Sequence, residues 1–273
     1  MIPSSDLHLH TTFCDGKQTP EQMVLAAIQQ GCTTVGFSGH VPTAVHWDLD
    51  WCIAEEKLTH YVQEIQRLKT VYADQIESLL GLELDYFSQK TCFDCDYTIG
   101  SVHYAKHALG YVPVDSSYEI LKNGVDSYYG GDFLALAKDF YANTAQIVEK
   151  TGCTIVGHFD LLTKYNEKYA YVNEEDSAYL KLALEALDCV LEKDVLIEFN
   201  TGAMARGWRT VPYPAPSLVK RIVEKRGRLI LNSDAHSAEH LRYAFPEAVE
   251  YARANGVREL WIYQNKRFSP IQI

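Results

Sequence analysis

Short apolar runs alternate along the chain with longer segments in which apolar residues recur at helical spacing. The short runs favour β-structure and predict seven strands, at 5–10, 33–38, 77–83, 97–102, 154–157, 195–199 and 228–231. Strands separated by helical segments are typical of βα units. The pattern therefore predicts an α/β fold with a largely parallel sheet.

The helical segments predict the crossovers between these strands. One spans 19–30 and begins with Thr19 as N-cap and Pro20 at the first helical position, and others span 55–72 and 238–255. A last apolar run at 260–263 fits either an extra strand or a tail packed on the outside.

The segment 104–132 fits the alternation badly, because it is rich in Tyr, Gly and Asp and is long for a simple connection. Long connections in compact domains are usually lids or binding loops. We therefore expect an insertion that covers the substrate; the alternative is an excursion that packs on the rim of the fold.

The chain has 273 residues, with 25 Lys and Arg against 36 Asp and Glu, which gives a net charge of −11. This acidity disfavours nucleic-acid binding. The composition, with 47% hydrophobic and 22% charged residues, is that of an ordinary globular protein. We expect one domain over 1–273.

The N-terminus has no basic region followed by an apolar one, and no stretch approaches about 18 apolar residues, so we expect neither export nor a membrane span. Seven cysteines, an odd number in a long chain, predict free thiols in a reducing cytoplasm. Cys92 and Cys95 form a CxxC with no second pair, and we interpret them as free thiols near a loop.

Residues that can ligate a metal gather at the ends of most predicted strands or in the loops just beyond them. The first strand ends in His8-Leu9-His10, whose alternation points both imidazoles to one side. In a barrel, the C-terminal ends of the strands face one rim, which carries the chemistry. The other residues of this kind are Asp15, His40, Glu83, His103, His158, Asp234 and His236.

Each of these residues has an ordinary explanation when it is taken alone. A lone His at a strand end is more often a packed or surface residue, and Asp15 or Glu83 could cap a helix or be solvated. Independent accidents would not place nine residues at one topological position. Cys14 lies beside Asp15 but off the pattern, and we interpret it as a bystander. The histidines without this placement, which we expect to have no role, are His46, His60, His107 and His240.

Nine donors exceed what one ion can use, since zinc takes about four ligands and an octahedral ion about six. The set therefore predicts two or three divalent ions. Imidazole and carboxylate donors without a clear thiolate suit zinc, manganese or iron.

The strings HLHTTFCDG, SGH followed by Pro42, GLE, GSVH, GHFD and NSDAH resemble the polymerase and histidinol phosphatase (PHP) family of metal-dependent phosphoesterases. The resemblance covers residues 6–236 and fills all nine ligand positions. GLELDY, GHFDLLTKYN and EFNTGAMARG most resemble the monofunctional histidinol-phosphatase branch of this family.

This resemblance implies a distorted (β/α)7 TIM-like barrel with a trinuclear centre at its C-terminal rim. It suggests one ion held by His8, His10, Glu83 and Asp234, a second by Glu83, His103 and His158, and a third by Asp15, His40 and His236. It also implies hydrolysis of L-histidinol phosphate, in histidine biosynthesis, by a hydroxide that bridges two ions. The alternatives are a PHP phosphoesterase for nucleoside bisphosphates or phosphotyrosine, and a non-catalytic metal-binding PHP module.

In the family pattern a basic residue follows a turn of Asn, Thr and Gly, which here begins at Asn200 and ends at Gly202, at the start of the loop TGAMARGWRT. This implies that Arg206 is a catalytic residue that binds the substrate phosphate without touching a metal. The alternative is a solvated loop arginine, and it weighs more heavily for Arg209.

Overall fold

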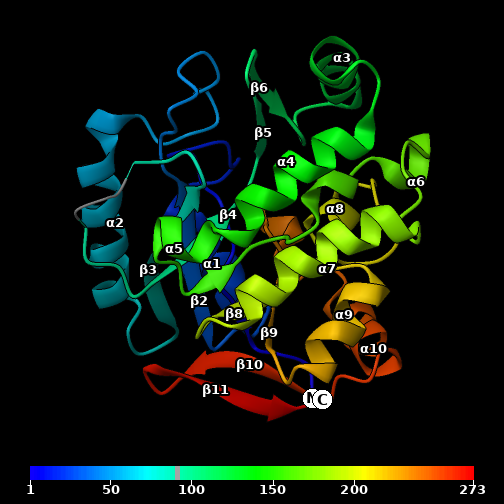
Figure 1. Ribbon diagram of the computed structural model, residues 1–273. Helices are drawn as coiled ribbons and strands as arrows, with labels where there is room; N and C mark the ends of the chain where they lie inside the picture. The colour runs from blue at the N-terminus through cyan, green and yellow to red at the C-terminus, as the bar shows by residue number, and fades with distance from the viewer. Residues whose placement is uncertain (90–92) are drawn as a thin grey trace.

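The computed structural model describes residues 1–89 and 93–273. At its centre lies a nine-stranded sheet with the order β1-β2-β3-β4-β7-β8-β9-β10-β11 (Figure 1). The first seven strands in this order are parallel and match the seven predicted runs. They are β1 (Ser5–Asp6), β2 (Thr34–His40), β3 (Glu77–Asp85), β4 (Tyr97–Ser101), β7 (Ile155–Val156), β8 (Leu196–Asn200) and β9 (Arg228–Asn232).

The sheet curls until its two sides meet at the C-terminal ends of the strands. Leu9, beyond β1, forms a parallel bridge with Ala235, beyond β9. The His10 N–H donates to the Ala235 carbonyl at 2.8 Å, and the Ala235 N–H donates to the His8 carbonyl at 3.0 Å. The fold is therefore the predicted distorted (β/α)7 TIM-like barrel, closed at the rim that carries the candidate ligands.

The first strand is shorter than the predicted 5–10, because side chains replace its backbone partners after Asp6. The Leu7 N–H donates to Asn232 Oδ1 at 2.9 Å, and the Leu9 N–H donates to Ser38 Oγ at 3.0 Å. These bonds hold the segment along the barrel wall although it is no longer a regular strand.

The apolar run at 260–263 is an added strand. It lies in β10 (Glu259–Gln264), which pairs in parallel with β9 and in antiparallel with β11 (Arg267–Gln272). Trp261, Tyr263 and Phe268 of this hairpin pack against apolar side chains of the barrel strands, among them Leu7 and Tyr97. The hairpin covers the N-terminal end of the barrel, opposite the rim (Figure 1).

Helices surround the outside of the sheet. The predicted first helix is confirmed as α1 (Pro20–Gln29): Thr19 accepts from the Gln22 N–H, and the Gln22 side chain accepts from the Thr19 N–H. Among the described residues, no helix combines the length and apolarity that a membrane span needs. The other long helices outside the insertion are α2 (Leu58–Val71), α4 (Phe133–Ala145), α7 (Ser177–Leu191), α9 (Pro216–Glu224) and α10 (Phe245–Ala254).

Two predicted helices begin later than expected. In the segment 55–72, a 3₁₀ turn η1 (Glu55–Lys57) precedes α2. In the segment 238–255, a 3₁₀ turn η3 (Ala238–His240) is followed by Arg242 and Ala244, whose positive φ values of 51° and 54° break the helix before α10. The remaining short elements are α5 (Ile147–Thr151), η2 (Leu161–Thr163), α6 (Asn166–Tyr169) and α8 (Gly202–Ala205).

The predicted insertion 104–132 forms a hairpin, β5 (Tyr104–His107) and β6 (Gly110–Pro113), followed by α3 (Tyr118–Tyr129). Its inner side chains, including Val112 and Leu121, are buried in the same core cluster as the inner face of α4. The segment stands above the C-terminal side of the sheet (Figure 1). Its role as a cover for the substrate stays a prediction.

Candidate metal centre and cleft

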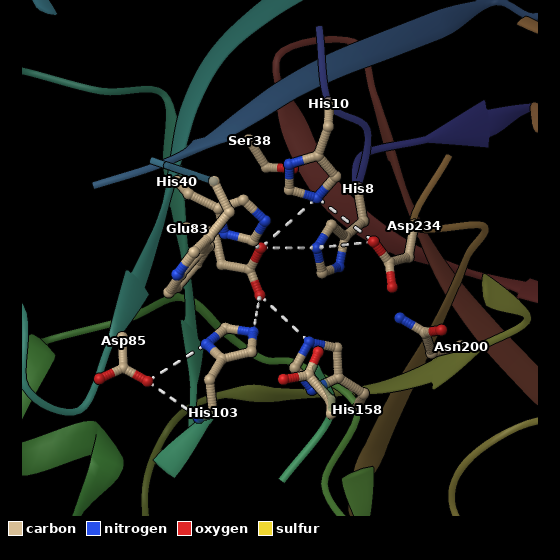
Figure 2. Close-up of polar contacts among 12 residues, drawn as sticks. His8, His10, Ser38, His40, Glu83, Asp85, His103, His158, Asn200 and Asp234 are labelled. Carbon is tan, nitrogen blue, oxygen red and sulfur yellow. Dashed lines mark hydrogen bonds and ion pairs between the residues drawn. The ribbon is translucent and has the colours of Figure 1, made fainter. Parts of the chain in front are cut away.

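All nine predicted ligands lie at the C-terminal rim of the barrel, in β2, β3 or the segments that follow the strands. Figure 2 shows those that surround Glu83, which are His8, His10, His40, His103, His158 and Asp234. Barrel closure brings His8, from the start of the chain, beside Asp234, from its end. The donor atoms of the nine predicted ligands form four overlapping groups, and within each group all the donor atoms lie within 4.8 Å of one another. The groups are His10, Asp15, His40 and His236; His8, His158 and Asp234; His8, His10 and Glu83; and His40, Glu83 and His103. That these groups bind ions stays a prediction.

Glu83 lies at the middle of the set and faces histidines on two sides. Its Oε2 lies 3.0 Å from both His8 Nε2 and His40 Nδ1, and its Oε1 lies 3.1 Å from His158 Nε2. The residue is fully buried, which by itself would raise its pKa, but His8 and His40 hold the pKa of Glu83 well below its usual range. Two separately directed oxygens are what a bridging carboxylate requires.

Two carboxylates behind the centre orient its histidines, and the sequence analysis missed both. Glu198 Oε1 lies 2.7 Å from His8 Nδ1, and Asp85 Oδ2 lies 3.1 Å from His103 Nδ1. A carboxylate on Nδ1 fixes the orientation of the ring and directs its Nε2 inward. The available signal for Glu198 was a charged residue inside the otherwise apolar strand run LIEF.

Three buried imidazole nitrogens of the predicted ligands lack a well-formed hydrogen bond among the described residues: His10 Nε2, His40 Nδ1 and His158 Nδ1. His10 Nε2 lies 3.3 Å from Asp234 Oδ1, and His40 Nδ1 faces Glu83. Burial and the nearby His40 and His236 lower the pKa of His10 to about 3, so this ring is neutral at physiological pH. A neutral imidazole whose Nε2 has no hydrogen-bond partner, set among carboxylates, fits a divalent ion that binds both ligand types.

The backbone around Asp234 and Gly202 is shaped for close approach. Asp234 has a positive φ of 51°, a conformation that non-glycine residues adopt at some cost. A Cβ atom at Gly202 would lie 2.7 Å from Asp234 Oδ2 and 2.8 Å from Arg206 Nη2. Glycine at this turn therefore lets the Arg206 guanidinium reach the centre.

Arg206 is tied to two of the predicted ligands. Its Nη2 donates to Asp234 Oδ2 at 2.9 Å, and its Nη1 lies 3.1 Å from His236 Nδ1. Among the described residues its buried Nε has no hydrogen-bond partner. Arg209 is not the solvated loop residue that we expected: it is buried and donates to the Thr163 carbonyl and hydroxyl, because the loop folds back over η2.

Six of the nine predicted ligands line a cleft of about 300 Å³; they are Asp15, His40, His103, His158, Asp234 and His236. Lys164 is largely buried in its wall and donates to the Asp115 carbonyl at 2.7 Å. The insertion 104–132 contributes three wall residues, so it borders the cleft directly. Wall residues that the sequence analysis missed are Asp48, Trp51, Tyr104, Asp115, Ser116, Leu161 and Lys164.

The residues expected to play no part lie apart from the donor groups, with one exception. The four remaining histidines are outside all four groups. Cys14 Sγ lies 3.7 Å from His10 Nδ1, but burial raises the pKa of Cys14 to about 12, which disfavours a thiolate ligand. Cys95 is a free thiol, whereas Cys92 lies outside the described residues.

Comparison with known sequences matches residues 6–202 to the PHP domain model. A Deinococcus radiodurans protein named "Probable histidinol-phosphatase" is 32% identical and aligns over 97% of this chain and 98% of its own length. A Bacillus subtilis protein named "Histidinol-phosphatase" is 26% identical over 90% of this chain and 98% of its own length.

Comparison with solved structures finds the same fold. A Listeria monocytogenes protein with a provisional histidinol phosphatase name has a TM-score of 0.75 at 21% identity, covering 89% of this chain and 99% of its own. Histidinol phosphate phosphatase from Lactococcus lactis, solved in complex with zinc, L-histidinol and phosphate, has a TM-score of 0.69 at 19% identity, covering 97% of this chain and 98% of its own.

Proposed function

The chain belongs to the PHP family, and on that basis we propose that it is a metal-dependent phosphomonoesterase that hydrolyses L-histidinol phosphate to L-histidinol and phosphate. The observation that carries the proposal is the set of nine imidazole and carboxylate donors around Glu83, at the base of a cleft. The names of the relatives support the choice of substrate, as do the L-histidinol and phosphate bound to the Lactococcus lactis protein.

We assign two or three divalent ions, zinc, manganese or iron, to the nine donors. His8, His10, Glu83 and Asp234 would hold one, Glu83, His103 and His158 a second, and Asp15, His40 and His236 a third. The overlap of the donor groups at Glu83 supports a shared ligand. When bound, such ions neutralise phosphoryl charge and lower the pKa of a bridging water, which supplies hydroxide at neutral pH.

The protein's own groups prepare the site for this chemistry. Glu198 and Asp85 hold His8 and His103 with their Nε2 atoms inward, so neither of these two imidazoles has to reorient when the substrate arrives. The Arg206 guanidinium lines the cleft and would supply donors for the phosphoryl oxygens. Arg206 would thus orient and neutralise the phosphate.

We further propose a single-domain cytoplasmic enzyme over 1–273 whose partner is a small phosphate ester, not a nucleic acid or a membrane. The net charge of −11 and the free thiols of the six described cysteines support this setting.

Phosphate release from a panel of esters tests the substrate assignment. The protein, loaded in turn with zinc, manganese and iron, is given L-histidinol phosphate, a nucleoside bisphosphate, phosphotyrosine and a sugar phosphate. We expect the highest kcat/KM for L-histidinol phosphate. A clear preference for another ester would reject the substrate, and metal-dependent stability without any phosphate release would indicate a binding module.

The His10→Ala variant tests the ligand assignment. Because His10 belongs to two donor groups, its loss should lower metal content and phosphatase activity together. His60, which is exposed on α2, provides the control, and His60→Ala should change neither. Elemental analysis of both variants is the measurement, and a full metal content in His10→Ala would remove His10 from the centre.

A further inference from the structure

The cleft has walls of different chemistry. Arg206, on one side, contacts Asp234 and His236. On another side, the Trp51 ring lies against His40 and His103, with ring centroids 4.5 and 5.0 Å apart. Asp48 and Tyr104 line the cleft beside Trp51. Arg206, the cation that would bind the phosphate, therefore contacts Asp234 and His236. The aromatic and acidic wall contacts a different pair of predicted ligands, His40 and His103.

Asp48, Trp51 and Tyr104 form a connected unit. The Tyr104 hydroxyl donates to Asp48 Oδ2 at 2.8 Å, and Trp51 Nε1 donates to the Asp48 carbonyl at 3.0 Å and lies 3.2 Å from the Tyr104 hydroxyl. Tyr104 is 1% exposed, so its hydroxyl is fixed by packing. Backbone bonds from Ile53 to His40 and from Ala44 to Phe87 anchor the loop that carries Asp48. The carboxylate is thus held in place before any ligand binds.

The charge of Asp48 is not compensated within the described residues. Within residues 1–89 and 93–273, no Lys, Arg or His side chain lies within 4.0 Å of the Asp48 carboxylate. No residue of these ranges donates a hydrogen bond to Asp48 Oδ1. Asp115, an acidic wall residue that is likewise not a predicted ligand, differs, because its Oδ2 lies 3.6 Å from Lys164 Nζ. A carboxylate with a free oxygen, next to an indole in a cleft, is suited to an ammonium group.

We propose that Asp48 and Trp51 bind the ammonium group of the substrate, so that the enzyme selects phosphate esters of amino alcohols over esters without an amine. Tyr104 is a positioning residue, because it holds the Asp48 carboxylate. This inference rests on the proposed function, which places the phosphate at the metal centre and Arg206. A substrate with an anionic and a cationic group matches the two walls, and a cleft of about 300 Å³ suits a small ligand.

The test compares two esters with the metal-loaded enzyme: L-histidinol phosphate and 3-(imidazol-4-yl)propyl phosphate, which lacks only the amine and its charge. In Asp48→Asn we expect the ratio of their kcat/KM values to fall roughly 10–100-fold, as for loss of a charge-assisted hydrogen bond. Tyr104→Phe should lower the ratio less. Asp50→Asn is the matched control, because Asp50 is exposed in the same loop, and it should keep the wild-type ratio.

A binding measurement separates this inference from the proposed function. Calorimetry with L-histidinol on the metal-loaded protein should show roughly tenfold or more weaker binding in Asp48→Asn and wild-type binding in Asp50→Asn. Binding that depends on Asp48 without phosphate release from either ester would reject the phosphatase and keep the ammonium site. Equal ratios and affinities in Asp48→Asn and wild type, or no binding of L-histidinol by the wild type, would overturn the ammonium site.

Discussion

Glu198 joins two predicted ligands, His8 and His158, to the strands behind the centre. Its carboxylate lies 2.7 Å from His8 Nδ1 and accepts from the His158 N–H and from the side-chain amides of Asn200 and Asn232. Burial raises its pKa, but His8 and the hydrogen bonds outweigh burial, and the pKa of Glu198 lies below its ordinary value. The carboxylate is therefore ionised and oriented whether or not the cleft is occupied.

Glu198→Gln should weaken metal binding roughly 10–100-fold, because an amide oxygen is a poorer acceptor for His8 Nδ1–H and no longer fixes that ring. Competition against a fluorescent chelator measures the affinity. Glu185→Gln, on the exposed face of α7, is the control and should bind metal as the wild type does. Wild-type affinity in Glu198→Gln would mean that packing alone orients His8.

Arg206→Ala should lower kcat/KM for L-histidinol phosphate, because it removes a guanidinium that would contact the phosphoryl oxygens. The expected loss of transition-state stabilisation is roughly 2 to 4 kcal/mol. Metal content must be measured in parallel, because Arg206 also bonds Asp234 and His236. Arg209 is buried and unsuitable as a control, whereas Arg267 is exposed on β11, far from the cleft. A near-parental kcat/KM in Arg206→Ala, compared with Arg267→Ala, would leave phosphate recognition to the ions.

At the scale of elements, the insertion 104–132 is built into the core although it interrupts the βα alternation. The N-cap Ser117 starts α3 by accepting from the Ile120 N–H. The inner face of α3 then buries Leu121 and Val125 in the cluster that also holds Leu136 of α4. This packing fixes Tyr104, Asp115 and Ser116, which line the cleft, so the stability of the insertion and the shape of the cleft are linked.

Leu121→Ala should lower the free energy of unfolding by roughly 2–5 kcal/mol, the range for truncating a buried leucine. Its neighbour Ile120 is 46% exposed, so Ile120→Ala should change stability much less. Urea denaturation of the two variants measures the difference. Equal stabilities would show that α3 does not share the core of the barrel.

At the scale of the whole molecule, barrel closure gathers three predicted carboxylate ligands into one partly buried centre. Glu83 and Asp234 are buried, and Asp15 lies beside His236 at 3.1 Å. Nearby histidines and Arg206 form ion pairs with these carboxylates, and bound ions would add positive charge beside them. Ions that bind the folded state alone therefore stabilise it.

Removal of metal by a chelator should lower the Tm. An ion whose free concentration is one hundred times its Kd adds about 2.7 kcal/mol to the free energy of unfolding. For a chain of this size that corresponds to a shift of roughly 5–10 °C. Scanning fluorimetry before and after chelation, and after return of each ion, is the measurement; the same treatment of His10→Ala should give a smaller shift. An unchanged Tm in the wild type would argue against resident ions.

The sequence alone determined the features that depend on neighbouring residues in the chain. Short apolar runs placed the seven parallel strands, local capping placed the start of α1, and the positions of the nine candidate ligands followed from where strands end. The rim could be predicted because parallel strands in a barrel end on the same side.

Only the tertiary structure decided the features that depend on closure of the barrel and on loops folding back. Glu198 and Asp85 look like ordinary strand acids until His8 and His103 lie against them. Asp48 and Lys164 belong to the cleft only because their segments pack across the rim. Side-chain periodicity is a local property, whereas these contacts join residues far apart in the chain, and no local pattern encodes which of them will meet.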